Sequence, residues 1–207
     1  MSSFYESKVL PILIHTACSN RQIMEIRRQI VPRAEGQVLE VGMGSGLNLE
    51  FYDRNKVEKV WGLEPSEGMR LKARANLQAS PVEVHWLDLP GERIPLEDES
   101  VDTVLLTYNL CTIPDWKAAL RQMHRVLKPQ GKLLFAEHGR APDANVRKWQ
   151  DRLTPIWKKI GGGCHLNRPI SDYLTQGGFK IQTVETFYMR QIPRVAGYMY
   201  VGEAAKD

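Results

Sequence analysis

The sequence predicts an α/β fold with a doubly wound, mostly parallel β-sheet. From residue 36 onward, short apolar runs alternate with amphipathic stretches, and the last two apolar runs follow one another without such a stretch between them. Strands that alternate with helices form parallel sheets covered on both faces, whereas strands joined without a crossover helix pair antiparallel. We therefore expect a seven-stranded sheet whose C-terminal pair lies antiparallel at one edge.

The expected strands are apolar runs bounded by glycine, proline and polar turn residues. In chain order they cover residues 37–41, 57–63, 82–87, 101–107, 132–137, 179–187 and 195–203. A turn at 128–131 precedes the fifth strand, because Pro129 presets φ and Gly131 supplies a positive φ.

Amphipathic stretches predict three helices between these strands, over residues 47–53, 67–77 and 116–127. In the last of these, apolar residues recur at spacings of three and four, which places them on one helix face. Residues 1–35 are expected to form a helical cover, because so short a segment cannot build its own core. We therefore interpret residues 1–207 as one domain, with the ligand-binding core over 36–207.

The composition is that of a soluble globular domain: 207 residues, 43% hydrophobic and 25% charged. The net charge is +4, but the basic residues are dispersed rather than gathered in a stripe, which disfavours a nucleic-acid partner. No apolar stretch reaches the roughly 18–20 residues of a membrane span, and Glu6 makes the N-terminus a poor secretory signal. We expect a cytoplasmic protein without a membrane span, and the oligomeric state stays open.

Three widely spaced cysteines, Cys18, Cys111 and Cys164, form neither a disulfide framework nor a CxxC zinc pattern. Reduced thiols and no metal ion are therefore expected. This usage agrees with a cytoplasmic location, where thiols stay reduced.

The strongest motif is Glu-Val-Gly-Met-Gly-Ser-Gly at 40–46, directly after the first strand. Glycines permit a tight turn and let backbone N–H groups approach a ligand closely. Leu47 stands where the dinucleotide-binding pattern GxGxxG requires glycine, and the carboxylate of Glu40 would repel a pyrophosphate. A ligand that carries a cationic ammonium or sulfonium group fits this loop better.

Two further carboxylates follow the second and third expected strands. Glu64 is placed to accept both hydroxyls of an adenosine ribose, and Asp88 to accept from an adenine amino group. Ligands of open α/β sheets bind in the crevice at the carboxyl ends of the strands. The three carboxylates therefore predict one binding site at that edge of the sheet.

These motifs resemble those of the class I S-adenosylmethionine-dependent methyltransferases, of the methyltransferase type 11 or UbiE-like group. The similar segments are the glycine loop 40–46, the acidic segment 64–69, the stretch 94–102 before the fourth strand and the turn 127–132. The resemblance covers residues 36–204 and implies a Rossmann-like fold that binds S-adenosyl-L-methionine and releases S-adenosyl-L-homocysteine. The residues expected to bind the cofactor are Glu40, Gly42, Gly44, Gly46, Asn48, Glu64, Pro65, Ser66, Met69, Asp88, Leu89, Asn109 and Leu110.

The methyl acceptor is expected to bind among the late loops, around residues 140–178. His138 and His165 are candidate general bases because their reference pKa lies near 6.5, with a structural or surface histidine as the alternative for each. Trp149 and Trp157 are expected to pack on the sheet, or to cover an apolar acceptor if they face the crevice. The residues expected to contact the acceptor are Tyr5, His15, Cys111, Trp157 and Cys164.

Residues 130–180 resemble a narrower subgroup, which includes the mammalian membrane-associated alkyl thiol S-methyltransferases. The similar pieces are Glu137-His138 and Pro-Ile-Trp-Lys-Lys-Ile-Gly-Gly-Gly-Cys at 155–164, but the long apolar anchor of those proteins has no counterpart here. We therefore expect methyl transfer to a small molecule, preferably a thiol. The alternatives are an O- or N-methyltransferase for a phenol, quinone precursor or phospholipid amine, an RNA methyltransferase, and a non-catalytic S-adenosylmethionine-binding module.

Overall fold

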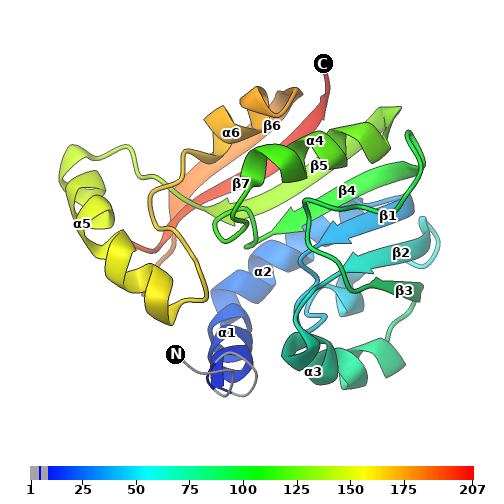
Figure 1. Ribbon diagram of the computed structural model, residues 1–207, viewed down its shortest axis with the longest axis horizontal. Helices are drawn as coiled ribbons and strands as arrows, with labels where there is room; N and C mark the ends of the chain where they lie inside the picture. The colour runs from blue at the N-terminus through cyan, green and yellow to red at the C-terminus, as the bar shows by residue number, and fades with distance from the viewer. Residues whose placement is uncertain (1–4, 6–8) are drawn as a thin grey trace.

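The computed structural model describes Tyr5 and residues 9–207, which form one seven-stranded sheet with strand order β3-β2-β1-β4-β5-β7-β6. The first five strands run parallel, and β7 runs antiparallel to both β5 and β6 (Figure 1). This confirms the predicted fold class. The strands are β1 (Gly36–Val41), β2 (Val57–Leu63), β3 (Glu83–Leu87), β4 (Val101–Thr107), β5 (Leu127–His138), β6 (Phe179–Tyr188) and β7 (Tyr198–Lys206).

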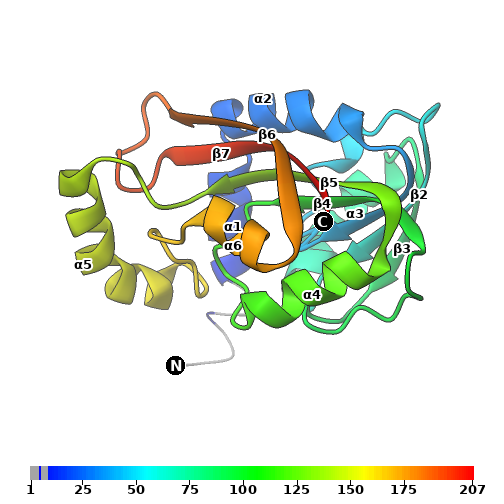
Figure 2. The same ribbon diagram turned by 90° about the horizontal axis from the view of Figure 1, so that it is seen from above.

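Helices cover both faces of the sheet, with α4 and α6 on one side and α2 on the other (Figure 2). The helices are α1 (Leu10–Cys18), α2 (Arg21–Ile30), α3 (Glu67–Gln78), α4 (Trp116–Val126), α5 (Ala144–Ile160) and α6 (Ile170–Gln176). Both α1 and α5 lie toward the carboxyl ends of the parallel strands (Figure 1). No helix in the described part of the chain is long and apolar enough to cross a membrane.

Alternation along each strand divides the core into two layers. In β1, Leu39 and Val41 pack in the layer that contains Leu120 of α4, whereas Val38 packs in the layer that contains Ile26 of α2. Successive side chains of a strand point to opposite faces. Glu40 therefore shares a face with Val38 and points toward α2, which decides its hydrogen-bond partners.

Two local predictions were wrong. The helix predicted over 47–53 is only a 3₁₀ turn at Leu49–Phe51, because the polar side chain of Asn48 is directed into the protein instead of continuing a helix face. The turn predicted at 128–131 is an irregularity inside β5, where the register moves from Val101 opposite Leu127 to Thr103 opposite Lys132.

The prediction that Trp149 and Trp157 pack on the sheet was also wrong. On α5 these side chains are 53% and 39% exposed. The inward face of α5 is polar: the fully buried Gln150 amide donates to the carbonyls of Gly139 and Leu166 and accepts from the N–H of Ala141. Hydrogen bonds therefore attach α5 to the loops beside it, and four of its large apolar side chains are exposed: Trp149, Ile156, Trp157 and Ile160.

Candidate active site

The glycine loop after β1 turns back on itself through three glycines with positive φ. Gly42, Gly44 and Gly46 have φ of +70°, +60° and +74°, a backbone conformation that other residues rarely adopt. A Cβ on Gly42 would lie 1.9 Å from Nδ2 of Asn109, and a Cβ on Gly44 would lie 3.2 Å from Cε of Met69. Asn109 and Met69, both predicted to bind the cofactor, therefore border the loop.

Glu64 follows β2 and lies against this loop. Its two oxygens accept the backbone N–H of Ser66 at 2.8 Å and of Gly44 at 3.0 Å, and the residue is 8% exposed. Burial raises the pKa of Glu64, while the two N–H donors lower it. Since a carboxylate oxygen can accept a second hydrogen bond, the carboxylate can still bind two hydroxyl groups of a ligand.

Glu40 belongs to a buried polar network under the glycine loop. Its carboxylate accepts from Nδ2 of Asn48 at 2.8 Å and from the hydroxyl of Tyr52 at 2.7 Å. Nη1 of Arg27, on α2, donates to Oδ1 of Asn48 at 2.6 Å and to the hydroxyl of Thr107 at 3.0 Å. Burial raises the pKa of Glu40 to about 7, although the bonds from Tyr52 and Asn48 lower it.

The side chains of Glu40 and Asn48 are thus occupied by partners inside the protein. Asn48 donates both amide hydrogens, to Glu40 and to Thr107, and each of the two predicted residues is 1% exposed. Glu40 and Asn48 are therefore placed to support the glycine loop from below, and Glu40 contributes negative charge beneath it. The sequence analysis missed Arg27, although it shares the apolar stripe of α2 with Ile23, Ile26 and Ile30, a pattern that marks a buried face.

The loop after β4 is held by Glu137 of β5. Oε1 of Glu137 accepts the backbone N–H of Asn109 at 2.7 Å and of Leu110 at 3.1 Å. Burial raises the pKa of Glu137 to about 7 despite these donors. Both amides therefore have an acceptor within the protein, and the expectation that Asn109 and Leu110 bind the cofactor stays a prediction.

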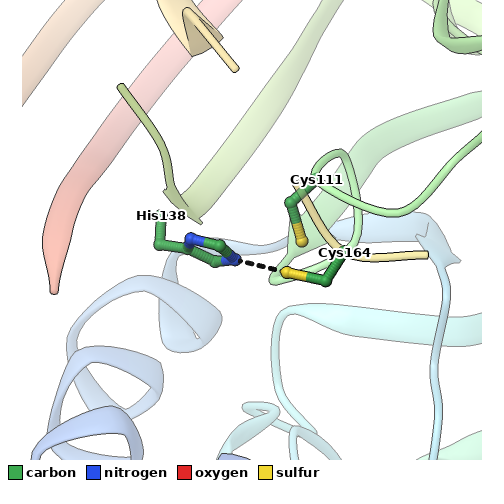
Figure 3. Close-up of side chains that lie close together, drawn as sticks. All are labelled: Cys111, His138 and Cys164. Carbon is green, nitrogen blue, oxygen red and sulfur yellow. Dashed lines mark hydrogen bonds between the residues drawn. The ribbon is translucent and has the colours of Figure 1, made fainter. Parts of the chain in front are cut away.

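Three side chains from separate elements meet beyond this loop (Figure 3). Cys111 comes from the loop after β4, His138 from the end of β5 and Cys164 from the connection between α5 and α6. Their Sγ and ring nitrogen atoms all lie within 4.8 Å of one another, and Nε2 of His138 lies 3.2 Å from Sγ of Cys164. The hydrogen bond with Cys111 and burial both raise the pKa of Cys164.

His165 lies beside this cluster but is directed at the backbone. Its Nδ1 lies 3.1 Å from the carbonyl oxygen of Cys111, which accepts a hydrogen bond only if Nδ1 carries the proton. That tautomer leaves Nε2 as an acceptor. Burial lowers the pKa of His165, and the positive charge of Arg168 lowers it further.

Helix α1 lies across the glycine loop. Nδ1 of His15 lies 2.8 Å from the hydroxyl of Ser45, so the helix contacts the loop directly. The hydroxyl of Tyr5 donates to the carbonyl of Ile160 at 2.8 Å, at the end of α5. His15 of α1 therefore contacts the glycine loop, and Tyr5 contacts the end of α5, where Trp157 lies.

The remaining predicted residues lie at the edge of this site. Pro65 and Asp88 are exposed, at the ends of β2 and β3, and Leu89 packs against the first core layer. The side chain of Ser66 accepts from the N–H of Met69 and begins α3 as its N-cap. The described structure shows no partner for Asp88 that would fix its position.

The fold and this site define an enzyme class, and comparisons with known proteins agree. The Methyltransferase domain family matches residues 39–135. Thiol S-methyltransferase TMT1B of Homo sapiens is 32% identical over 166 residues, which are 74% of this chain and 67% of the human protein. TMT1B of Rattus norvegicus is 37% identical over 139 residues, 65% of this chain but only 56% of the rat protein. The chain belongs to the class I S-adenosylmethionine-dependent methyltransferases.

A solved structure supports the fold over the whole chain. It is a S-adenosylmethionine-dependent methyltransferase, described as a possible histamine N-methyltransferase, from Thermotoga maritima. The TM-score is 0.68 at 22% identity, and the match covers 99% of this chain and 98% of that chain. As a member of this family, the protein is an enzyme whose cofactor is S-adenosylmethionine. The residues of the site fit that cofactor. Among the described residues, a Cβ on Gly44 would meet the flexible Cε of Met69 at 3.2 Å and the carbonyl oxygen of Gly42 at 3.9 Å, so the backbone there is open to a ligand, and Glu64 keeps acceptor capacity for a ribose.

Proposed function

We propose that this enzyme transfers the methyl group of S-adenosylmethionine to the sulfur atom of a small thiol. The observation that carries the proposal is the acceptor side of the site, where Cys111, His138, Cys164 and His165 lie together. The carboxylate of Glu137, next to His138, is fully buried and already accepts two backbone N–H groups. An alcohol needs a strong base, whereas a thiol such as cysteine, with a pKa of about 8.5, needs little help to ionise.

The cofactor supplies a methyl group that its sulfonium charge already activates. The enzyme has to bind and align the acceptor, keep water out and accept one proton. We assign cofactor binding to the glycine loop and to Glu64, with Asp88 as the adenine partner. The acceptor thiolate forms the new S–CH₃ bond, and the electron pair of the broken bond stays on the former sulfonium sulfur.

We assign the acceptance of the proton from the acceptor to one of two histidines, His138 or His165. Nε2 of His165 is free to accept in the tautomer that the Cys111 carbonyl selects. Nε2 of His138 is engaged by Cys164. His165 is therefore the better placed base in this arrangement, and we keep His138 as the second candidate.

Two parts of the chain, α1 and the elements at 140–178, are assigned to the cover of the site and to acceptor binding. We propose that α1 covers the glycine loop, because His15 contacts Ser45, and that the elements at 140–178 bind the acceptor. The exposed Trp157 on α5 offers an apolar surface for an alkyl chain. We place the enzyme in a reducing compartment such as the cytoplasm, since Cys111 and Cys164 are unpaired thiols side by side.

The test is a panel of alkyl thiols, phenols, amines and a short RNA with methyl-labelled S-adenosylmethionine. We expect label on the thiols alone. Transfer to phenols or amines without transfer to thiols would overturn the acceptor assignment, and binding of the cofactor without transfer to any acceptor would argue for a binding module. Trp157→Ala should raise the KM for long alkyl thiols, whereas Trp149→Ala, equally an exposed tryptophan of α5, should not.

A further inference from the structure

We propose that Sγ of Cys111, Nε2 of His138 and Sγ of Cys164 bind a zinc ion, whose open fourth position takes the acceptor thiol. The metal site stands on the geometry of these three side chains alone. The role given to the acceptor rests on the proposed function. The sequence suggested no metal, because the three ligands are far apart along the chain and follow no CxxC spacing.

The separation of the donor atoms is close to that of a tetrahedral zinc site. Zinc lies about 2.3 Å from thiolate sulfur and about 2.0–2.1 Å from imidazole nitrogen, which sets ligand atoms about 3.5–3.8 Å apart. The three atoms here lie within 4.8 Å of one another, and Nε2 of His138 lies 3.2 Å from Sγ of Cys164. Side-chain shifts of about 1 Å or less are enough to reach tetrahedral geometry.

The donor set selects the metal and its use. Thiolate and imidazole together suit zinc, and a site of two cysteines and one histidine with a fourth position open is an arrangement of catalytic zinc. Among the described residues, the contacts of the Cys111 sulfur outside the cluster are long, 3.6 Å to the hydroxyl of Thr112 and 3.8 Å to the carbonyl of Tyr108.

The backbone holds the two cysteine loops together. The N–H of His165 donates to the carbonyl of Cys111 at 2.9 Å. Because His165 directly follows Cys164, this bond holds the two cysteines close together. Gly162 and Gly163 have φ of +60° and +89°, so the chain turns sharply just before Cys164. Glu137, next to His138, holds the N–H of Leu110, next to Cys111. Each ligand is therefore positioned by an adjacent hydrogen bond or turn.

A zinc ion here would activate the acceptor without a strong base. Two thiolates and one neutral imidazole balance the charge of Zn²⁺, and a coordinated thiol loses its proton readily, which Nε2 of His165 is placed to accept. The resulting thiolate attacks the methyl carbon, the S–CH₃ bond forms and the C–S bond of the sulfonium breaks with its electron pair on that sulfur. The methylated product is an uncharged thioether, a weaker zinc ligand than a thiolate, and it leaves.

The experiment measures metal binding first and separately from activity. The reduced, untagged chain is equilibrated with zinc chloride and separated from unbound metal by gel filtration. Its zinc content is then measured by inductively coupled plasma mass spectrometry. We expect about one zinc ion per chain, with loss to background in Cys111→Ser, Cys164→Ser and His138→Ala. Cys18→Ser is the matched control and should retain zinc. Circular dichroism and S-adenosylhomocysteine binding identify any variant that fails to fold.

Cobalt(II) in place of zinc reports the ligands directly. We expect a thiolate-to-cobalt charge-transfer band in the near ultraviolet, absent from Cys164→Ser, which strengthens when an alkyl thiol is added. A folded, reduced wild-type chain that retains no zinc and shows no such band overturns the metal site, even if thiols are still methylated. A band that an alkyl thiol does not change leaves the metal but overturns its role toward the acceptor. A disulfide between Cys111 and Cys164 in the chain kept under reductant would also overturn the site.

Discussion

Replacement of Glu64 by alanine tests how the enzyme holds its cofactor. The carboxylate accepts one backbone N–H on each oxygen, from Ser66 at 2.8 Å and Gly44 at 3.0 Å, which leaves one acceptor position on each for the ribose hydroxyls. A hydrogen bond to a charged group contributes about 1.5–3 kcal/mol. The loss of one such bond should therefore weaken binding by roughly 10- to 100-fold, and the loss of both by more.

The assay is isothermal titration with S-adenosylhomocysteine, which binds at the same site without turnover. Glu67→Ala is the matched control. Glu67 lies three residues further on and is exposed, and its replacement by alanine removes the same charge. Thermal unfolding shows whether Glu64→Ala remains folded once the two N–H groups lose their acceptor. An affinity within about twofold of wild type in a folded Glu64→Ala chain, less than one hydrogen bond would give, refutes the ribose role, as does an equal loss in Glu67→Ala.

Three further outcomes follow from the buried contacts. Because Glu40 has a pKa of about 7 in the folded chain, above the ordinary value of 4.5, the unfolded chain loses this proton first. Its contribution to stability against urea should thus fall by up to about 3 kcal/mol between those pH values; Glu40→Gln should remove that part, and the part due to Glu137, whose pKa is also raised to about 7, should remain. His15→Ala removes one partly buried hydrogen bond to the loop and should speed S-adenosylhomocysteine dissociation about 2- to 10-fold in stopped flow; identical rates contradict a cover role for α1. Glu137→Ala leaves the N–H groups of Asn109 and Leu110 without their acceptor and should cost about 2–5 kcal/mol in urea unfolding, whereas Glu137→Gln keeps the acceptor and should cost less.

The sequence located the seven strands because local pattern determines them, but β7 covers residues 198–206 and not the predicted 195–203, since residues 194–196 form a turn. β2 and β4 begin and end at the predicted residues, since each is an apolar run bounded by turn residues. The segment at 47–53 has the composition of a helix, but the hydrogen bonds of Asn48 to Glu40 and Thr107 decide its shape. Those partners come from distant strands, so no local pattern contains them.

In the site, too, some residues follow from local sequence pattern and others depend on contacts between distant segments. The glycines and Glu64 follow their strands directly, and the sequence placed them at the same edge of the sheet. The cluster of Cys111, His138 and Cys164 depends on three loops that meet only in the folded chain. The burial of Arg27 could have been predicted, because a charged residue on the apolar stripe of a helix indicates a buried partner. The identity of that partner, Asn48, could not be predicted from the sequence.

The position of β7 has a consequence for how the chain is made. This last strand lies between β5 and β6, so β6 pairs with the sheet only through a strand that is synthesised after it. Until residues 198–206 have left the ribosome, β5 presents an open edge and β6 has no place in the sheet. Exposed strand edges pair with other chains. The nascent enzyme is therefore most prone to aggregation just before its final strand emerges, and a stop codon shortly before residue 198 should yield insoluble protein.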